Sequence, residues 1–252
     1  MTRAGQAADP AYGLIINADC DLVHCKIDGV VSYLPVYSFS YFFERFWIPN
    51  YVKSRRLEIL ASIRQVCGLQ EDKHNSLVSW IREDEAKSIA ERLSKTYKIK
   101  ASTFLGKIEE LQLIERSDFF DCALLERLIK VQGLEWTDTV QKLARRALKN
   151  IGEGHFFINE IAGLQEIGFV VRMTRIYGID ADDVFSSRPQ LVIAGDQVRV
   201  RAVRIAKLTN VYRFKIAQLF AYQFSRIGLP DEITELNEVA VQAAVFEMGR
   251  KR

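Results

Sequence analysis

The sequence predicts an α+β fold in which strands near both ends of the chain flank a central helical region. Residues 12–36 and the stretch after residue 154 are rich in β-branched and aromatic residues, whereas residues 50–151 repeat their apolar side chains at helical spacing. Three parts are predicted: an N-terminal β segment (1–49), a helical region (50–151), and a C-terminal β-hairpin with helices (152–252). If the two sets of strands share one sheet, the first and third parts pack as one domain.

The N-terminal part predicts strands at Tyr12–Ala18 and Val30–Val36, joined by a loop that contains Asp28-Gly29. Seven aromatic residues follow: Tyr37, Phe39, Tyr41, Phe42, Phe43, Phe46 and Trp47. Such a cluster is typical of a helix or lid that packs on the core. The alternative is an exposed aromatic surface that receives a ligand, a partner or a second subunit.

The helical region begins with Leu57, Leu60, Ala61 and Arg64 at helical spacing, and Gly68 suits the C-terminal end of that helix. Further helices are predicted over 74–80, 84–97, 101–114, 118–131 and 137–151. Thr137 is the expected N-cap of the last of these, because its hydroxyl can accept from the free amides of a first turn.

The C-terminal part predicts strands at His155–Ile158 and Phe169–Met173. Gly195-Asp196 predicts a hairpin turn between strands at 190–194 and 197–203. A helix is expected from Asn210 to Ile227, where Gly228 and Pro230 end it, and Asp231 is the expected cap of a last helix.

Composition narrows the class of protein. The 252 residues are 48% hydrophobic and 27% charged with a formal net charge of +3, which is typical of a globular protein and unlike a disordered one. No apolar run approaches the roughly 20 residues that span a bilayer, and the first residues lack the apolar core of a secretory signal. Four scattered cysteines then indicate reduced thiols. We therefore expect a cytoplasmic protein without a membrane segment.

The densest group of reactive side chains is Asp19-Cys20-Asp21 with His24 and Cys25. One interpretation is a nucleophilic Cys20 with a histidine base, although two flanking carboxylates raise a thiol's pKa and strand alternation separates neighbouring side chains. A second is a metal site, formed either by the thiols and His24 or by Asp19 and Asp21 around Mg²⁺. The third is structural: Cys20 packs in the core, and the carboxylates cap the following loop or meet a basic partner. The structural interpretation is favoured, so no cofactor and no metal are predicted.

Residues 84–116 resemble a winged-helix core, with one helix over Asp84–Leu93 and a second that ends in Leu113-Ile114-Glu115-Arg116, where the family places a β-wing. The resemblance implies that Lys98, Lys100, Ser102, Thr103 and Lys107 face phosphates and bases. The turn lacks a glycine, and a helix is expected at the position of the wing. Any two adjacent helices of a bundle give a similar pattern.

A longer basic segment lies nearer the C-terminus. From Gln197 to Pro230 the chain has no Asp or Glu, but it has seven basic residues: Arg199, Arg201, Arg204, Lys207, Arg213, Lys215 and Arg226. A hairpin followed by a helix could present these residues as one positive surface for nucleic-acid phosphates. The alternative is that they pair with acids such as Glu83, Asp84 and Glu85.

Two short segments, Ile15–Leu22 and Phe224-Ser225-Arg226-Ile227-Gly228-Leu229-Pro230, are similar to a group of uncharacterised bacterial proteins found in mobile-element and phage-conflict neighbourhoods. The resemblance implies a bacterial cytoplasmic protein that belongs to a phage-conflict system, such as antiphage defence, or to a mobile-element system. The sequence as a whole predicts a non-catalytic adaptor or regulatory protein that binds a protein partner or nucleic acid. The alternative is a thiol- or metal-dependent hydrolase centred on Asp19, Cys20, Asp21 and His24.

Overall fold

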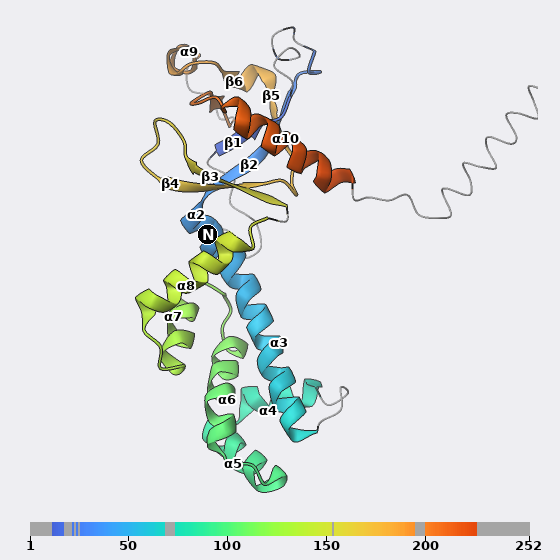
Figure 1. The fold of residues 1–252 in the computed structure, drawn as a ribbon, viewed down its shortest axis with the longest axis vertical. Helices are drawn as coiled ribbons and strands as arrows, with labels where there is room; N and C mark the ends of the chain where they lie inside the picture. The colour runs from blue at the N-terminus through green and yellow to red at the C-terminus, as the bar shows by residue number, and fades with distance from the viewer. Residues whose placement is uncertain are drawn as a thin grey trace, which may run out of the picture. The chain divides into compact units, whose positions relative to one another are not determined.

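The computed structural model describes residues 12–17, 22, 24, 26–68, 74–152, 154–194 and 200–225. It confirms the predicted α+β class: an antiparallel sheet is built from both ends of the chain, and the helices lie mainly between its strands in the sequence (Figure 1). The chain divides into two compact units, residues 1–206 and residues 207–252. The first contains the sheet and the helical bundle.

The sheet joins strands that are far apart in the sequence. β2 (Val30–Ser38) pairs with β1 (Tyr12–Ile15), and it also pairs with both β4 (Ile167–Arg172) and β5 (Tyr177–Asp180). β3 (His155–Glu160) pairs with β4 and completes the sheet. All these pairings are antiparallel, and they confirm that N- and C-terminal strands share one sheet.

Pro35 marks a break in the pairing along one edge of β2, while on the other edge it stays opposite Gly13 of β1. The pairing with β5 ends at Tyr33, and the pairing with β4 begins at Val36. On this edge the partner chain has more residues between Val171 and Tyr177 than β2 has between Tyr33 and Val36. Because proline has no amide hydrogen to donate, it is tolerated in a sheet where the neighbouring strand bulges away.

The aromatic segment forms a helix that continues into the bundle. α2 (Phe39–Phe42) passes through a π-helical turn (Phe43–Trp47) into α3 (Ile48–Cys67). Rings stack at every fourth residue, with centroid separations of 6.0 Å from Phe39 to Phe43 and 5.0 Å from Phe43 to Trp47. Phe42, Phe43 and Tyr37 are buried, which supports the interpretation of this segment as core packing.

The titration of Tyr37 lowers the free energy of unfolding at alkaline pH. Burial raises the pKa of its hydroxyl to about 12, and the neighbouring Tyr177 adds to the rise while Arg172 opposes it. The unfolded chain therefore loses this proton first, near pH 10, so the contribution of Tyr37 is complete below pH 10 and is lost as the pH rises toward 12. We expect the wild type to lose about 1 kcal/mol more than Tyr37→Phe between pH 8 and pH 11. Urea unfolding at both pH values measures this difference, and equal losses in the two proteins would contradict it.

The bundle consists of α3 and five helices that follow it. They are α4 (His74–Glu83), α5 (Ala86–Tyr97), α6 (Ser102–Glu115), α7 (Cys122–Val131) and α8 (Trp136–Lys149). Their apolar faces enclose one core whose fully buried residues include Ile48, Ile59, Ile63, Ile81, Ile89, Phe104, Ile108 and Leu111. Figure 1 shows α3 leading from the sheet into this bundle.

The predicted ends of these helices are mostly confirmed. Gly68 follows α3 in the left-handed conformation (φ 61°), as expected for a C-terminal glycine. The predicted N-cap Thr137 is wrong, because the cap of α8 is Glu135, whose carboxylate accepts from the amides of Thr137 and Asp138 at 2.9 and 2.6 Å. These backbone hydrogen bonds lower the pKa of Glu135.

The predicted strand at 190–194 is also wrong. Residues Arg188–Ile193 form the short helix α9, with Pro189 in its first turn, where proline's missing amide and fixed φ suit a helix start. The side chain of Gln190 accepts from Ser186 Oγ at 2.7 Å and from the Ser186 amide at 3.2 Å, which holds the entry to α9. The Gly195-Asp196 turn lies outside the described residues. Of the predicted strand over 197–203, only Ala202–Val203 is a described strand (β7), and it pairs in parallel with Val184–Phe185 (β6).

In the second unit, α10 (Asn210–Ser225) confirms the helix predicted from residue 210. The predicted last helix after Asp231 and the Gly228 to Pro230 stop lie outside the described residues, as does Arg226.

Candidate nucleic-acid interface

α8 carries basic and apolar side chains on opposite faces. Val140, Leu143, Ala144 and Ala147 pack toward the core of the bundle. Four exposed basic residues repeat at i, i+3, i+4 and i+7 on the other face: Lys142, Arg145, Arg146 and Lys149. At about 100° per residue, these four lie within an arc of about 100°. We call these four residues the α8 basic face.

The local sequence explains why α8 forms and which of its faces is buried. Glu135 caps its first turn, and its apolar residues recur at helical spacing, so one face is buried. Arg146 and Lys149 lie in the last turn, where a positive charge favours the helix dipole. Lys142 and Arg145 lie before that turn, so the dipole does not account for their charge.

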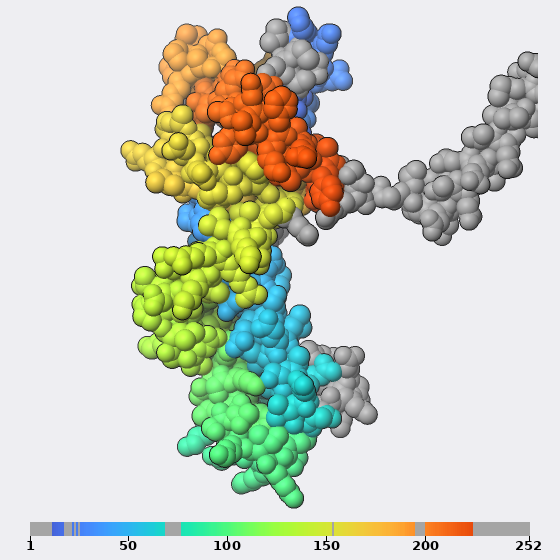
Figure 2. Space-filling model, in the orientation of Figure 1, coloured from blue at the N-terminus to red at the C-terminus, as the bar shows by residue number. Residues whose placement is uncertain are grey.

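The α8 basic face is not neutralised by neighbouring acids. None of its four residues forms an ion pair with a residue that the structure describes. No Asp or Glu occurs from Thr139 to Gly152, and Asp138 lies one turn before Lys142. Figure 2 shows the yellow-green atoms of this stretch at the molecular surface. Four uncompensated cations on one exposed helix face create a local positive potential.

Several arginines of the other bundle helices are instead paired with acids. Arg55 binds buried Glu110 through two hydrogen bonds, and Arg56 and Arg82 both bind Glu115. Arg92 pairs with Asp84 at 3.2 Å. The pairs of Arg55, Arg56 and Arg82 join α3 and α4 to α6, and the pair of Arg92 joins α5 to the turn before it. These charges therefore serve the packing of the bundle.

The basic segment predicted at 197–230 is only partly free to form a surface. Arg201 is 12% exposed; its Nε lies 3.8 Å from Asp183 Oδ1 and its guanidinium lies over the Phe185 ring. Pairing with an acid was the alternative interpretation of these arginines, although the acid is Asp183 and not Glu83, Asp84 or Glu85. Arg204 is exposed, and Arg199 lies outside the described residues.

The remaining predicted basic residues of this segment belong to the second unit. Lys207, Arg213 and Lys215 are exposed there, the last two on α10. Lys207 and Arg213 each interact with other groups of the protein. Nucleic-acid binding by these three residues therefore stays a prediction, and it concerns the second unit alone.

The residues implied by the winged-helix resemblance lie around the turn between α5 and α6. Lys98 and Lys100 are exposed in this turn, as are Ser102 and Thr103 at the start of α6. Lys107 instead donates to Ser62 Oγ at 2.6 Å, which links α6 to α3. α7 follows α6 at the position that a wing would take, as the sequence predicts.

The alternative hydrolase site cannot be assembled from described residues. Asp19, Cys20, Asp21 and Cys25 lie outside them, and His24 is exposed. Burial raises the pKa of the Cys67 and Cys122 thiols, so neither is activated as a thiolate. His155 packs edge-on against Phe42. Within the described part of the chain, no group of three His, Cys, Asp or Glu residues could hold a metal ion.

Sequence reasoning missed the α8 basic face, although its signal is present. The spacing of Lys142, Arg145, Arg146 and Lys149 places them on one helix face, as the spacing of Val140 and Leu143 places the apolar ones. The α8 basic face becomes recognisable once the structure shows that the opposite side of the helix packs against the core.

Comparison of this chain with known proteins finds no match. No protein-family model matches the chain, and neither the curated proteins nor the solved structures yield a match. Among the helices that the structure describes, none combines the length and the apolar character needed to cross a membrane.

Proposed function

We propose that the protein is a non-catalytic regulatory protein that binds the backbone of duplex nucleic acid through the α8 basic face. The observation that carries the proposal is the set of four exposed cations on one side of α8 without an acid partner among the described residues. Lysine and arginine bind phosphate oxygens, and the release of counterions drives this binding.

The dimensions of α8 favour contact with successive phosphates. Lys142 and Lys149 are seven residues apart, or roughly 10 Å along the helix axis. A duplex carries a phosphate on each strand about every 3.4 Å of its axis, so such a span can meet several of them.

The chemistry of the face favours a duplex over a single strand. Sequence-tolerant binding of single strands relies on aromatic side chains on which bases stack. Trp136, the aromatic residue of α8, is 38% exposed, but it lies on the helix side that also carries Val140, away from the α8 basic face. We therefore expect phosphate contacts with little sequence preference.

A comparison of three double charge reversals tests this proposal. Lys142→Glu with Arg145→Glu changes the α8 basic face but leaves the last turn of the helix intact. Lys98→Glu with Lys100→Glu changes the α5–α6 turn, and Arg213→Glu with Lys215→Glu changes α10. Fluorescence anisotropy with a labelled DNA duplex at low salt should show a large loss of affinity for the first variant.

The three variants change the net charge equally, so they control for long-range attraction. Thermal unfolding of each variant checks that the fold is retained. If the Lys98 and Lys100 variant loses affinity while the α8 variant does not, the winged-helix surface binds the duplex and the α8 proposal is wrong. A wild type that binds no duplex at low salt also contradicts the proposal.

A further inference from the structure

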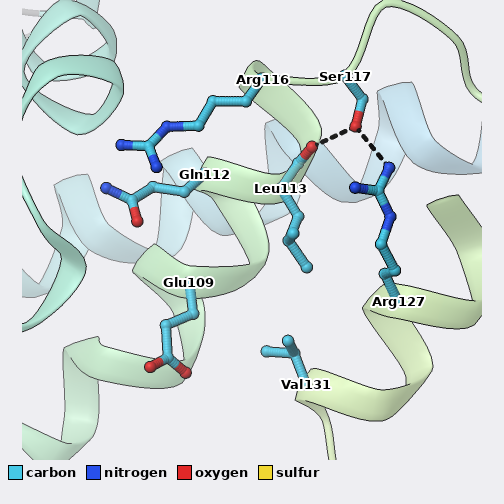
Figure 3. A pocket seen from close by; sticks show the side chains of 7 residues that line it. All are labelled: Glu109, Gln112, Leu113, Arg116, Ser117, Arg127 and Val131. Carbon is cyan, nitrogen blue, oxygen red and sulfur yellow. Dashed lines mark hydrogen bonds between the residues drawn. The ribbon is translucent and has the colours of Figure 1, made fainter.

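A second surface, between α6 and α7, combines an apolar floor with a basic rim. An open pocket of about 470 Å³ lies there, and Leu113 and Val131 supply its apolar lining (Figure 3). Arg116 and Arg127 contribute the positive charge. Glu109 lines the pocket away from Ser117, so the charge is unevenly distributed along it.

Both arginines are held in place by neutral oxygen atoms. Arg127 donates to Ser117 Oγ at 3.2 Å, and that hydroxyl donates to the Leu113 carbonyl at 2.6 Å. Arg116 donates to the Arg82 carbonyl at 3.0 Å. Neither arginine forms an ion pair with a carboxylate in the described ranges. A guanidinium has five donor hydrogens, so these contacts leave donors for a ligand.

We propose that this pocket docks a segment of a protein partner in which an acidic residue lies on one side of an apolar side chain. The apolar side chain would lie between Leu113 and Val131, and a carboxylate would bind the Arg127 guanidinium. Because Glu109 lines the far end, the acidic residue lies toward Ser117. A nucleic acid would use the two arginines but would leave the apolar floor unfilled, so the peptide is the better match.

The inference goes beyond nucleic-acid binding, because it gives the protein a second partner at a separate surface. Arginine is suited to such a rim, since its planar group can bind a carboxylate through two hydrogen bonds. Protein interfaces commonly anchor a side chain in a pocket that is surrounded by a polar rim. Together the two surfaces would let the protein act as an adaptor.

Labelled synthetic peptides test the inference. The probe peptide places one leucine beside aspartates; one matched peptide carries asparagine in place of aspartate, and another carries serine in place of leucine. We expect the full-length protein to bind the first peptide about ten-fold more tightly than either matched peptide, as measured by fluorescence anisotropy. Arg127→Glu and Val131→Ser should each remove most of this preference.

Two control variants separate the possible outcomes. Lys98→Glu, which changes the net charge as Arg127→Glu does, should leave peptide binding unchanged. Lys142→Glu with Arg145→Glu should also leave it unchanged, so a failure of the nucleic-acid proposal does not affect this test. The inference is overturned if the aspartate peptide binds no better than the asparagine peptide, or if Arg127→Glu binds it normally. It is also overturned if Arg127→Glu weakens duplex binding rather than peptide binding, because the rim would then contact nucleic acid.

Discussion

Replacing Arg55 with methionine should lower the free energy of unfolding by about 3 kcal/mol, because it leaves a carboxylate buried without its cationic partner. Glu110 is 3% exposed. Its two oxygens accept from Arg55 Nε at 2.6 Å and from Arg55 Nη2 at 2.9 Å. Gln132 donates to the same carboxylate at 2.9 Å, so this one group joins α3, α6 and α7. Urea unfolding at neutral pH measures the loss.

A matched substitution and a double variant identify the cause of that loss. Arg92→Met removes an arginine whose partner, Asp84, is 36% exposed, so its cost should stay below about 1 kcal/mol. Arg55→Met with Glu110→Met removes both charges and should recover most of the stability. If Arg55→Met costs no more than Arg92→Met, the buried carboxylate does not depend on its partner.

Lys142→Glu with Arg145→Glu should weaken binding to a DNA duplex by roughly 50-fold at about 0.1 M salt. Each lost phosphate contact forgoes the release of about 0.9 of a counterion, which lowers the affinity by close to a factor of eight at that salt concentration. Reversal of the charge, rather than its removal, should make the loss larger. The matched Lys98 and Lys100 variant should lose only the small share that follows from its lower net charge.

The effect should be the same for duplexes of different sequence. Phosphate contacts carry no sequence information directly, so the variant should lose affinity by a similar factor for each duplex tested. A loss confined to one sequence would indicate contacts with base edges, and α8 would then be read as a recognition helix.

Much of the fold could be predicted from local patterns. Helix periodicity located α3 to α8 because their buried apolar residues recur at helical spacing, although α6 also buries Glu110 and Gln112. β-branched runs located β2 and β4. Short elements were harder to predict. Leu191 to Ile193 look like a strand in composition, yet Pro189 and the Ser186–Gln190 hydrogen bonds start a helix there. β5, at Tyr177–Asp180, has only four residues and depends on its pairing with β2.

The candidate site was harder to predict than the fold because charge counts do not show which charges are compensated. Arg201 belongs to an acid-free stretch of sequence, but its acid, Asp183, comes from an earlier turn. Arg145 has acids nearby in the sequence at Glu135 and Asp138, but Glu135 is engaged at the helix cap. Pairing of this kind depends on tertiary contacts, which one sequence does not reveal.

The salt dependence of duplex binding tests the central claim most directly. If all four residues of the α8 basic face bind phosphates, a plot of log K against log salt should have a slope of about −3 to −4 for the wild type. For Lys142→Glu with Arg145→Glu, the slope should be shallower by about 2. A wild-type slope near zero, or an equal slope in the two proteins, would show that α8 does not contact the nucleic-acid backbone.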